Sequence, residues 1–260
     1  MIILKIIIAI IIFAACAGIF AFVLDILRES NKHSPYGPYE KFFKRFLDAF
    51  LATGALIVLF PILFIVAFLV KIKLGSPVLF TQERPGMDEK IFKLYKFRTM
   101  TDEKDENGNY KSDSERLTNL GKKLRATSID ELPELFNIVK GDMSIVGPRP
   151  LMPSYLPYYT EKEHQRHEVR PGLSGLAQSK GRSFISWEEI FKYDLEYVHC
   201  ITFAKDCSIV FGTIKNLLKK KDVVDFSKTY IGEDGRKHVK IGNEDFIIHN
   251  PLDEERKNMD

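Results

Sequence analysis

Two adjacent carboxylates, Asp130 and Glu131, are the residues whose types and spacing most clearly suggest chemistry. Ser128 and Glu131 have the spacing of a capping box, so we expect both acids in the first turn of a helix from about Ile129 to Val139. Pro133 agrees, because proline is tolerated only early in a helix. Acidic residues at a helix N-terminus also stabilise it against the helix dipole, without any role in chemistry. Spacing alone leaves both interpretations open.

The catalytic interpretation uses the local geometry of such a turn. Adjacent helical carboxylates point in different directions, so one could attack a phosphorus atom while the other holds a metal ion. The unpaired N–H groups and positive potential of the same turn favour a phosphate. A carboxylate nucleophile that attacks phosphorus is known from aspartyl-phosphate chemistry. The acid pair is therefore a candidate phosphate-directed site.

Several arginines stand beside prolines and glycines, where the backbone is restricted. The set is Arg125, Arg149 between two prolines, Arg170 before Pro171-Gly172, and Arg182 after Gly181. The planar guanidinium suits phosphate because it makes two parallel hydrogen bonds. Any one of these side chains could instead be an ordinary surface residue. Together with the acid pair they favour a ligand that carries phosphate.

Other functional classes find little support in the sequence. It contains no P-loop motif, no Gly-x-Gly-x-x-Gly and no Asp-x-Asp, which argues against NTPases, dinucleotide enzymes and common metal-dependent glycosyltransferases. His164 and His167 could bind a metal, but no third ligand is near, and an exposed helix face is the simpler explanation. A net charge of +3 gives no argument for nucleic acid. Three scattered cysteines predict no disulfide framework.

The elements that position these residues begin with an apolar run from Ile6 to Leu24. A helix of this length is about 28 Å long, enough to cross the hydrocarbon core of a bilayer. A cleaved signal peptide is the alternative, but it would have a shorter apolar region and a small-residue cleavage site. The basic residues cluster after this run, at Arg28, Lys32, Lys41, Lys44 and Arg45, with Lys5 before it. This asymmetry predicts that the rest of the chain is cytoplasmic.

A second apolar run, from Ala49 to Val70, contains Pro61 near its middle and has basic residues on both flanks. Proline removes a helical hydrogen bond and clashes with the preceding turn. We therefore expect two half-helices, broken at Pro61, that enter and leave the membrane on one face. A kinked helix that crosses the membrane is the alternative.

The remaining chain is expected to be a small mixed α and β domain. Val78–Gln82 and Ile91–Phe97 are β-rich runs around a turn, which predicts a hairpin. Residues 101–116 are polar and predict a loop or mobile lid. Ser186 and Glu189 form a capping box for a further helix. The stretch from Ile209 to Lys221 is amphipathic and basic, which suits a membrane surface or, equally, an ordinary cationic helix end.

Five segments resemble the bacterial sugar transferases, the monotopic polyprenyl-phosphate phosphoglycosyl transferases. They lie in order and at the expected spacing between Phe42 and Leu218: Phe80–Gly86, Lys96–Met100, Ser128–Pro133, Gly141–Pro150 and Arg170–Gly175. The resemblance implies transfer of a phospho-sugar from a UDP-sugar to undecaprenyl phosphate, with release of UMP and use of Mg²⁺. This chain departs from the family pattern in having Phe60 before Pro61 where many members have serine, and in its added N-terminal run.

The resemblance also assigns roles to individual residues. Asp130 would form a covalent phospho-sugar intermediate and Glu131 would hold the metal. Four basic residues match those expected to contact phosphate: Lys96, Arg125, Arg149 and Arg170. Pro61 matches the break of the re-entrant helix, and Asp194 matches a helix carboxylate whose role stays open.

The resulting fold class is a membrane-associated α+β protein with a catalytic domain on the cytoplasmic face of the bacterial inner membrane. The expected units are a transmembrane helix with its linker (1–40), a re-entrant helix (41–74), a catalytic domain (75–221) and a C-terminal tail (222–260). Expected partners are the UDP-sugar, undecaprenyl phosphate and inner-membrane lipid, with no nucleic acid; a second copy or other glycan-assembly enzymes are open. The alternatives are a sugar-only glycosyltransferase that releases UDP and a non-catalytic membrane scaffold.

Overall fold

The computed structural model describes residues 34–180 and 186–218, the backbone of three strands between 229 and 247, and four single residues near the N-terminus. The predicted spanning helix from Ile6 to Leu24 therefore lies largely outside the described residues, as do Arg182 and the end of the amphipathic stretch. In the predicted tail, β5 (Thr229–Ile231), β6 (Lys237–Ile241) and β7 (Glu244–Ile247) form an antiparallel sheet.

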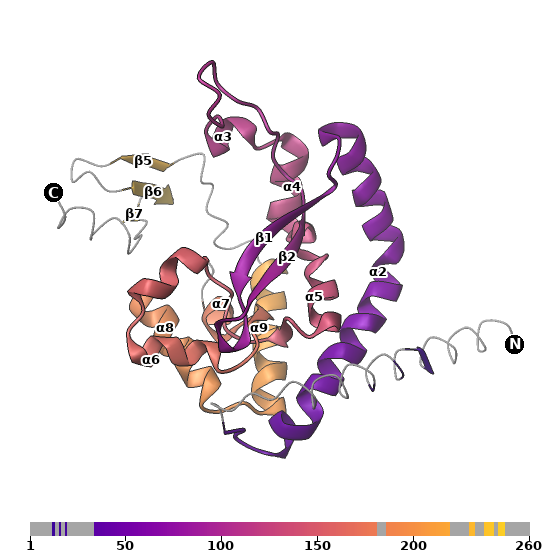
Figure 1. Ribbon diagram of the computed structural model, residues 1–260, viewed down its shortest axis with the longest axis vertical. Helices are drawn as coiled ribbons and strands as arrows, with labels where there is room; N and C mark the ends of the chain where they lie inside the picture. Colours follow the sequence, from indigo (N-terminus) through magenta and orange to yellow (C-terminus); the bar gives the residue numbers. More distant parts are fainter. Residues whose placement is uncertain are drawn as a thin grey trace, which may run out of the picture.

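A long helix runs beside the rest of the molecule from one end to the other (Figure 1). It begins as a π-helical turn, Tyr39–Phe43, and continues as α2 (Lys44–Leu74). The predicted break at Pro61 is wrong, because α2 passes through this residue without interruption. Leu56 and Leu59 before Pro61 pack in the same apolar cluster as Leu63 and Val66 after it. Packing on both sides of the proline thus keeps the helix continuous despite the lost hydrogen bond.

The predicted hairpin is confirmed and supplies one wall of the domain. Strands β1 (Leu79–Pro85) and β2 (Ile91–Phe97) pair antiparallel, with Phe80 opposite Lys96. A short 3₁₀ turn, Met87–Glu89, closes the hairpin. Residues 101–116, predicted as a loop, are largely irregular but include α3 (Asp113–Arg116).

The acid pair lies in a different local structure from the one predicted. Helix α4 (Asn119–Thr127) ends at Ser128, whose left-handed backbone (φ 55°) excludes the expected capping box. A 3₁₀ turn, Ile129–Glu131, follows, and α5 (Glu134–Lys140) begins only after Pro133, its N-cap residue. The segment predicted as one helix from Ile129 to Val139 is therefore a 3₁₀ turn followed by α5, and the left-handed Ser128 separates this turn from α4.

A two-stranded parallel sheet joins the first half of the domain to the second. Strands β3 (Ser144–Val146) and β4 (Gly172–Ser174) pair through Ser144 with Gly172 and Val146 with Ser174. The segment between them contains a 3₁₀ helix (Pro153–Tyr158), α6 (Glu161–His164) and a 3₁₀ turn (Gln165–His167).

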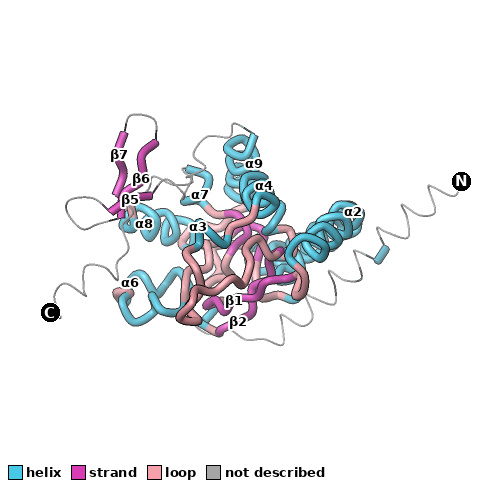
Figure 2. The backbone as a smooth tube through the Cα atoms, turned by 90° about the horizontal axis from the view of Figure 1, so that it is seen from above, coloured by secondary structure: helices cyan, strands magenta, loops and turns pink. Residues whose placement is uncertain are grey.

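The C-terminal part of the domain is helical. It consists of α7 (Leu176–Lys180), α8 (Trp187–Val198) and α9 (Phe203–Leu218). The predicted capping box at the start of α8 is confirmed, because Ser186 Oγ accepts from the Glu189 backbone N–H and the Glu189 carboxylate accepts from the Ser186 N–H. Seen from above, α8 lies on the far side of the domain from α2 (Figure 2). Helix α9 instead meets the start of α2, where Lys44 pairs with Asp206 at 2.6 Å.

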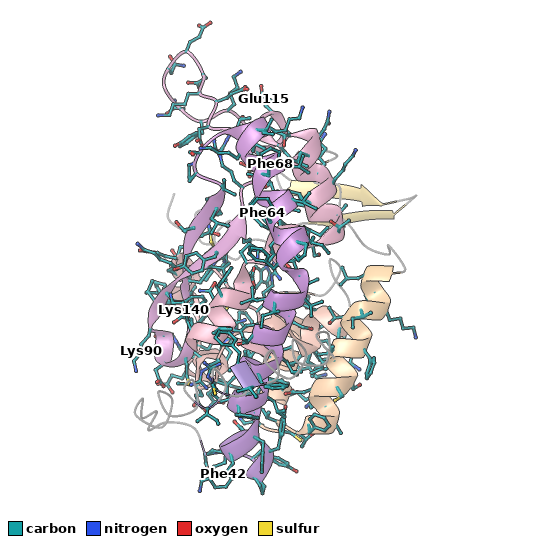
Figure 3. All side chains as sticks on the ribbon, turned by 90° about the vertical axis from the view of Figure 1, so that its right-hand side faces the viewer. Phe42, Phe64, Phe68, Lys90, Glu115 and Lys140 are labelled. Carbon is teal, nitrogen blue, oxygen red and sulfur yellow. The ribbon has the colours of Figure 1, made fainter. Side chains whose placement is uncertain are left out.

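One face of α2 packs on the domain and the other is exposed and apolar. Ala49 and Ala52 near one end and Leu63, Val66 and Val70 toward the other are buried. The opposite face carries large exposed side chains, among them Phe64 and Phe68, and Phe42 is exposed in the turn before the helix; all three are labelled along this side of the molecule in Figure 3. Tyr39–Leu74 is the one helix in the described part of the chain that is long and apolar enough to cross a membrane. The molecule is thus a mixed α and β domain with a membrane-type helix along one side.

Candidate active site

The two predicted acids sit in the 3₁₀ turn between α4 and α5, in contrasting environments. Asp130 is buried, with 8% of its surface exposed. Among the described residues, no lysine, arginine or histidine nitrogen lies within 4.0 Å of its carboxylate, so it forms no ion pair there. Glu131 next to it is bound by two cations. Within the described residues, the turn therefore holds one carboxylate without an ion-pair partner beside one that pairs with two cations.

Glu131 is the centre of a compact charge cluster. Its Oε1 atom accepts a hydrogen bond from Lys96 Nζ at 2.7 Å and another from the Arg149 guanidinium at 2.9 Å. Lys96 Nζ also lies 3.1 Å from Glu134 Oε1. Both donors use the same oxygen, so the Oε2 atom of Glu131 has no donor in the described chain. The cluster brings together three of the predicted residues: Glu131, Lys96 and Arg149.

The surroundings shift the two acids in opposite directions. Burial raises the pKa of Asp130, and the nearby Glu131 charge raises it further, against the attraction of Lys96 and Arg125. Burial also acts to raise the pKa of Glu131, but Arg149 and Lys96 outweigh it and bring that pKa down to about 2. Adjacent carboxyl groups with separated pKa values are typical of sites in which two acids have different tasks.

The hairpin positions Lys96 through a buried side chain on α5. Asn137 donates its amide hydrogen to the Lys93 carbonyl at 2.8 Å and accepts from the Tyr95 backbone N–H at 3.1 Å. These two bonds imitate a neighbouring strand, so α5 is fixed along the edge of β2. Asn137 is completely buried. The strand that carries Lys96 is thereby aligned with the turn that carries Glu131.

Arg149 is placed by the rigid Pro148-Arg149-Pro150 segment. Its guanidinium is 45% exposed, and Glu131 raises its pKa. The backbone of this segment is held by two further arginines: Arg166 donates to the Arg149 carbonyl at 2.7 Å, and Arg84 donates to the Pro150 carbonyl at 3.2 Å. Burial lowers the pKa of Arg84, and the like charge of Arg149 lowers it further. Two guanidinium groups of like charge face the region of the acids, which favours an anionic ligand.

The other two predicted arginines lie in different places. Arg125, near the end of α4, donates to Thr99 Oγ1 at 3.1 Å, and its charge stabilises the ionised form of Asp130. Arg170 instead donates to the Gly141 carbonyl at 3.0 Å, at the opposite end of α5 from the acids. Burial lowers its pKa to about 10. The structure thus brings Arg125 near the site but does not bring Arg170 to it, and a phosphate contact by Arg170 is not supported by its position.

Glu134 is a site residue that the sequence analysis missed. It is buried at the start of α5 and contacts Lys96. Burial, together with the charge of Glu131, raises its pKa to about 7, although Lys96 and Arg149 oppose the shift. The available signal was its spacing, since residues three and four apart share a helix face and Glu134 follows Glu131 and Asp130 at those distances.

The carboxylates of Asp130 and Glu131 could supply part of a binding site for a divalent cation such as Mg²⁺. Mg²⁺ is commonly held by one or two carboxylates together with substrate phosphate oxygens and water. The described residues contain no group of three or more metal-binding side chains, so they offer no complete cage. Glu131 Oε2 is an oxygen without a donor, next to a second carboxylate on Asp130. This donor set fits Mg²⁺ only as part of a complex with phosphate.

Fold and site together define a membrane-associated transferase with an acidic pair surrounded by arginine and lysine. Residues 39–220 match the model of the bacterial sugar transferase family, and the chain belongs to that family. It is 52% identical to the uncharacterized sugar transferase EpsL of Bacillus subtilis over 62% of this chain and 80% of that protein.

Two further relatives carry more specific names. A UDP-glucose:undecaprenyl-phosphate glucose-1-phosphate transferase of Klebsiella pneumoniae is 38% identical over 70% of this chain. A UDP-N-acetylgalactosamine-undecaprenyl-phosphate N-acetylgalactosaminephosphotransferase of Aeromonas hydrophila is 35% identical over 75% of it. The matched regions cover 41% and 48% of those longer proteins. The chain therefore spans less than half of each of these two relatives.

Proposed function

We propose that this protein transfers a phospho-sugar from a UDP-sugar to undecaprenyl phosphate and releases UMP. The observation that carries the proposal is the turn at Asp130 and Glu131. Among the described residues, it places a buried carboxylate without an ion-pair partner beside a carboxylate that is tied to Lys96 and Arg149. Relatives named for this reaction with glucose and with N-acetylgalactosamine support the substrate class. The identity of the sugar is not part of the proposal.

In the first step, a carboxylate oxygen of Asp130 attacks the phosphorus that carries the sugar. A bond from that oxygen to phosphorus forms, and the bond to the bridging oxygen breaks, so UMP leaves with the electron pair. Burial makes Asp130 more basic and strips it of water, which strengthens it as a nucleophile. In the second step, a phosphate oxygen of undecaprenyl phosphate attacks the same phosphorus and displaces Asp130 as a carboxylate.

The cations of the site bind and orient the diphosphate. The Arg149 guanidinium is nearly half exposed and can turn a donor toward phosphate while Lys96 stays on Glu131. Arg125 lies on the Asp130 side and can hold the transferred phosphoryl group. A Mg²⁺ ion bound by Glu131 would neutralise charge on the leaving phosphate. Positioning and charge neutralisation are the main requirements of phosphoryl transfer.

The placement of α2 supports a site at one face of the membrane. Near the start of α2, Arg45 donates to the Ile138 carbonyl at 2.6 Å. At its other end, the Leu74 carbonyl accepts from Arg98 at 3.2 Å. Both ends are thus bound to one polar domain, which cannot lie on two sides of a bilayer. We infer that α2 enters the lipid from the cytoplasmic side with its exposed apolar face and returns there, even though it is not broken at Pro61.

The test is to assay UMP release with undecaprenyl phosphate and a panel of UDP-sugars, and to search for the Asp130 adduct by mass spectrometry. We expect UMP, and a sugar-phosphate mass on the peptide that contains Asp130 when the lipid acceptor is withheld. Asp130→Asn should abolish both signals, and Glu131→Gln should lower the rate about 100-fold or more, as expected for loss of a group that acts only in the transition state. Asp113→Asn, an exposed carboxylate on α3, is the matched control and should behave as wild type.

The assay also separates the alternatives. Release of UDP in place of UMP would indicate transfer of the sugar alone, and absence of both nucleotides would favour a non-catalytic scaffold. Full turnover by Asp130→Asn would discard the covalent mechanism but leave the phospho-sugar transfer itself standing.

A further inference from the structure

A buried ion pair connects α8 to the backbone of the active-site arginine. Asp194 on α8 and Arg166 in the 3₁₀ turn Gln165–His167 both have only 2% of their side chains exposed. Asp194 Oδ2 accepts from Arg166 Nε at 3.1 Å and from its terminal nitrogen Nη2 at 2.7 Å. The same Nη2 atom donates to the Arg149 carbonyl at 2.7 Å. One guanidinium therefore joins a buried carboxylate to the residue that contacts Glu131.

The local backbone explains what this contact controls. A residue that precedes proline is confined to extended conformations, so Pro150 restricts Arg149, and Pro148 restricts the chain before it. The main freedom left is the orientation of the Arg149–Pro150 peptide, whose oxygen is the atom bound by Arg166. With the Arg149 carbonyl bound by Arg166 and the Pro150 carbonyl bound by Arg84, the backbone of Arg149 is held in one conformation and its side chain starts from a fixed position. Its guanidinium must reach Glu131 Oε1 at 2.9 Å.

Stability is a weak explanation for such a pair. Removing two charges from water costs several kcal/mol for each ion, and well-packed apolar replacements of buried pairs are often equally stable or more stable. The surroundings are already apolar and aromatic, because the Arg166 guanidinium lies 5.9 Å from the Tyr159 ring and 5.7 Å from the Phe191 ring. A specific use of the guanidinium fork accounts better for an arginine in this place.

We propose that Asp194 is a positioning residue that acts through Arg166 to hold Arg149 in the orientation needed for phosphate binding. Asp194 orients the Arg166 fork, and Arg166 fixes the Arg149 carbonyl. Arg149 then presents its guanidinium to Glu131 and to the diphosphate. The inference rests on the proposed phospho-sugar transfer, and it assigns α8 a part in the site although neither Asp194 nor Arg166 contacts Asp130 or Glu131 in the contacts described.

The first test is a double-mutant cycle between Arg166 and Arg149, measured as UMP release. Arg166→Lys keeps a positive charge for Asp194 but lacks the fork that serves two acceptors at once. We expect it to lower kcat/KM about tenfold or more, as for a misplaced catalytic group, mainly by raising KM for the UDP-sugar. In the Arg149→Lys background the same change should have little further effect, because the two residues act through one contact.

The second test removes the pair without leaving a buried charge. The double variant Arg166→Met, Asp194→Leu should melt within a few degrees of wild type and still lose activity about tenfold or more. Glu196→Gln, an exposed position on α8, is the control and should retain wild-type kinetics. If Arg166→Lys fails to fold, the comparison of the apolar double variant with Glu196→Gln still tests whether the ion pair is needed for activity.

Two results would overturn the inference while wild-type UMP release stands. One is full activity in the apolar double variant, and the other is independent, multiplicative losses from Arg166→Lys and Arg149→Lys. Absence of UMP release by the wild-type protein would instead overturn the proposed function, and the inference with it.

Discussion

At the scale of single residues, three neighbouring carboxyl groups of the site differ in their ion pairing and in their pKa values. Asp130 is buried and has no ion-pair partner in the described part of the chain, Glu131 is held ionised by Arg149 and Lys96, and Glu134 is buried with a pKa near 7. Lys96 contacts both Glu131 and Glu134, and Arg149 contacts Glu131. Carboxylate oxygens and cations thus lie side by side in the cluster, which suits a ligand that brings a divalent cation and phosphate together.

The raised pKa of Glu134 predicts a pH dependence of stability. The folded protein holds this proton up to about pH 7, whereas the unfolded chain releases it near its ordinary value of 4.5. The folded state thus binds more protons between these values, so the contribution of Glu134 to stability is full below pH 4.5 and falls as the pH rises toward 7. The loss should be on the order of 1–3 kcal/mol.

Glu134→Gln provides the measurement, because glutamine has nearly the same shape and does not titrate. Thermal melting in detergent between pH 4.5 and 8 should show wild type losing stability relative to the variant as the pH rises. Parallel curves for the two proteins would contradict the raised pKa. Glu115→Gln, on exposed α3, is a control and should leave the slope between pH 4.5 and 8 unchanged.

Residue types and neighbours in the sequence indicated Asp130, Glu131 and Arg149 as candidates, whereas Lys96 was indicated only by the resemblance to the family. The sequence could not predict that both donors use Glu131 Oε1, because that depends on the packing of Asn137 against β2. For Arg170, the sequence predicted a role in the site that the position of its side chain does not support. Its Pro-Gly neighbours indicate a restricted backbone, but only the fold shows that its side chain closes the far end of α5.

At the scale of elements, the hairpin and α8 were predictable because a turn signal and a capping box are local. The 3₁₀ turn of the acids was not, since it depends on the left-handed backbone of Ser128, a conformation that serine seldom adopts. The continuity of α2 through Pro61 also escaped prediction. It follows from tertiary packing of Leu59 and Leu63 on one cluster, which outweighs the local effect of proline.

The close approach of the backbones at Gly147 and Gly172, beside the paired strands β3 and β4, predicts that a side chain at Gly172 is not tolerated. A Cβ added to Gly172 would lie 2.1 Å from the Gly147 backbone nitrogen, and this backbone contact cannot relax as a flexible side chain would. Gly172→Ala should therefore destabilise the protein by about 3 kcal/mol or more. Gly54→Ala on α2 is the matched control, because nothing lies within 4 Å of the new Cβ.

Thermal melting of both variants in detergent checks this prediction. Gly54→Ala should be neutral or stabilising by about 0.5–1 kcal/mol, since alanine favours helix more than glycine does. Equal melting temperatures for Gly172→Ala and wild type would show that β3 and β4 do not approach each other as closely as described.

At the scale of the whole molecule, the attachment of α2 at both ends predicts the membrane topology. Lys41 before the helix and Lys73 near its end are both exposed. In a protein whose native cysteines are replaced, Lys41→Cys and Lys73→Cys should both react with a membrane-impermeant maleimide in inverted inner-membrane vesicles. Neither should react in intact spheroplasts if both ends lie on the cytoplasmic side, as we propose.

Labelling of the two cysteines from opposite sides would mean that α2 crosses the bilayer. That result would contradict the bonds that join Arg45 and Leu74 to the same domain. Glu115→Cys, on α3 of the catalytic domain, reports the side on which the site lies and should follow the two lysine positions.

The packing of α2 against the domain determines which concentration of the lipid substrate should set the reaction rate. Leu63, Val66 and Val70 of α2 pack in one apolar cluster with Leu124, and Ile129 of the acid turn packs against it, so the anchor and this turn keep a fixed distance from each other. In the proposed reaction, the lipid acceptor would reach the turn by lateral diffusion within the leaflet. The relevant concentration is its mole fraction in the leaflet, and turnover should follow that surface density, not the amount of lipid suspended in the buffer.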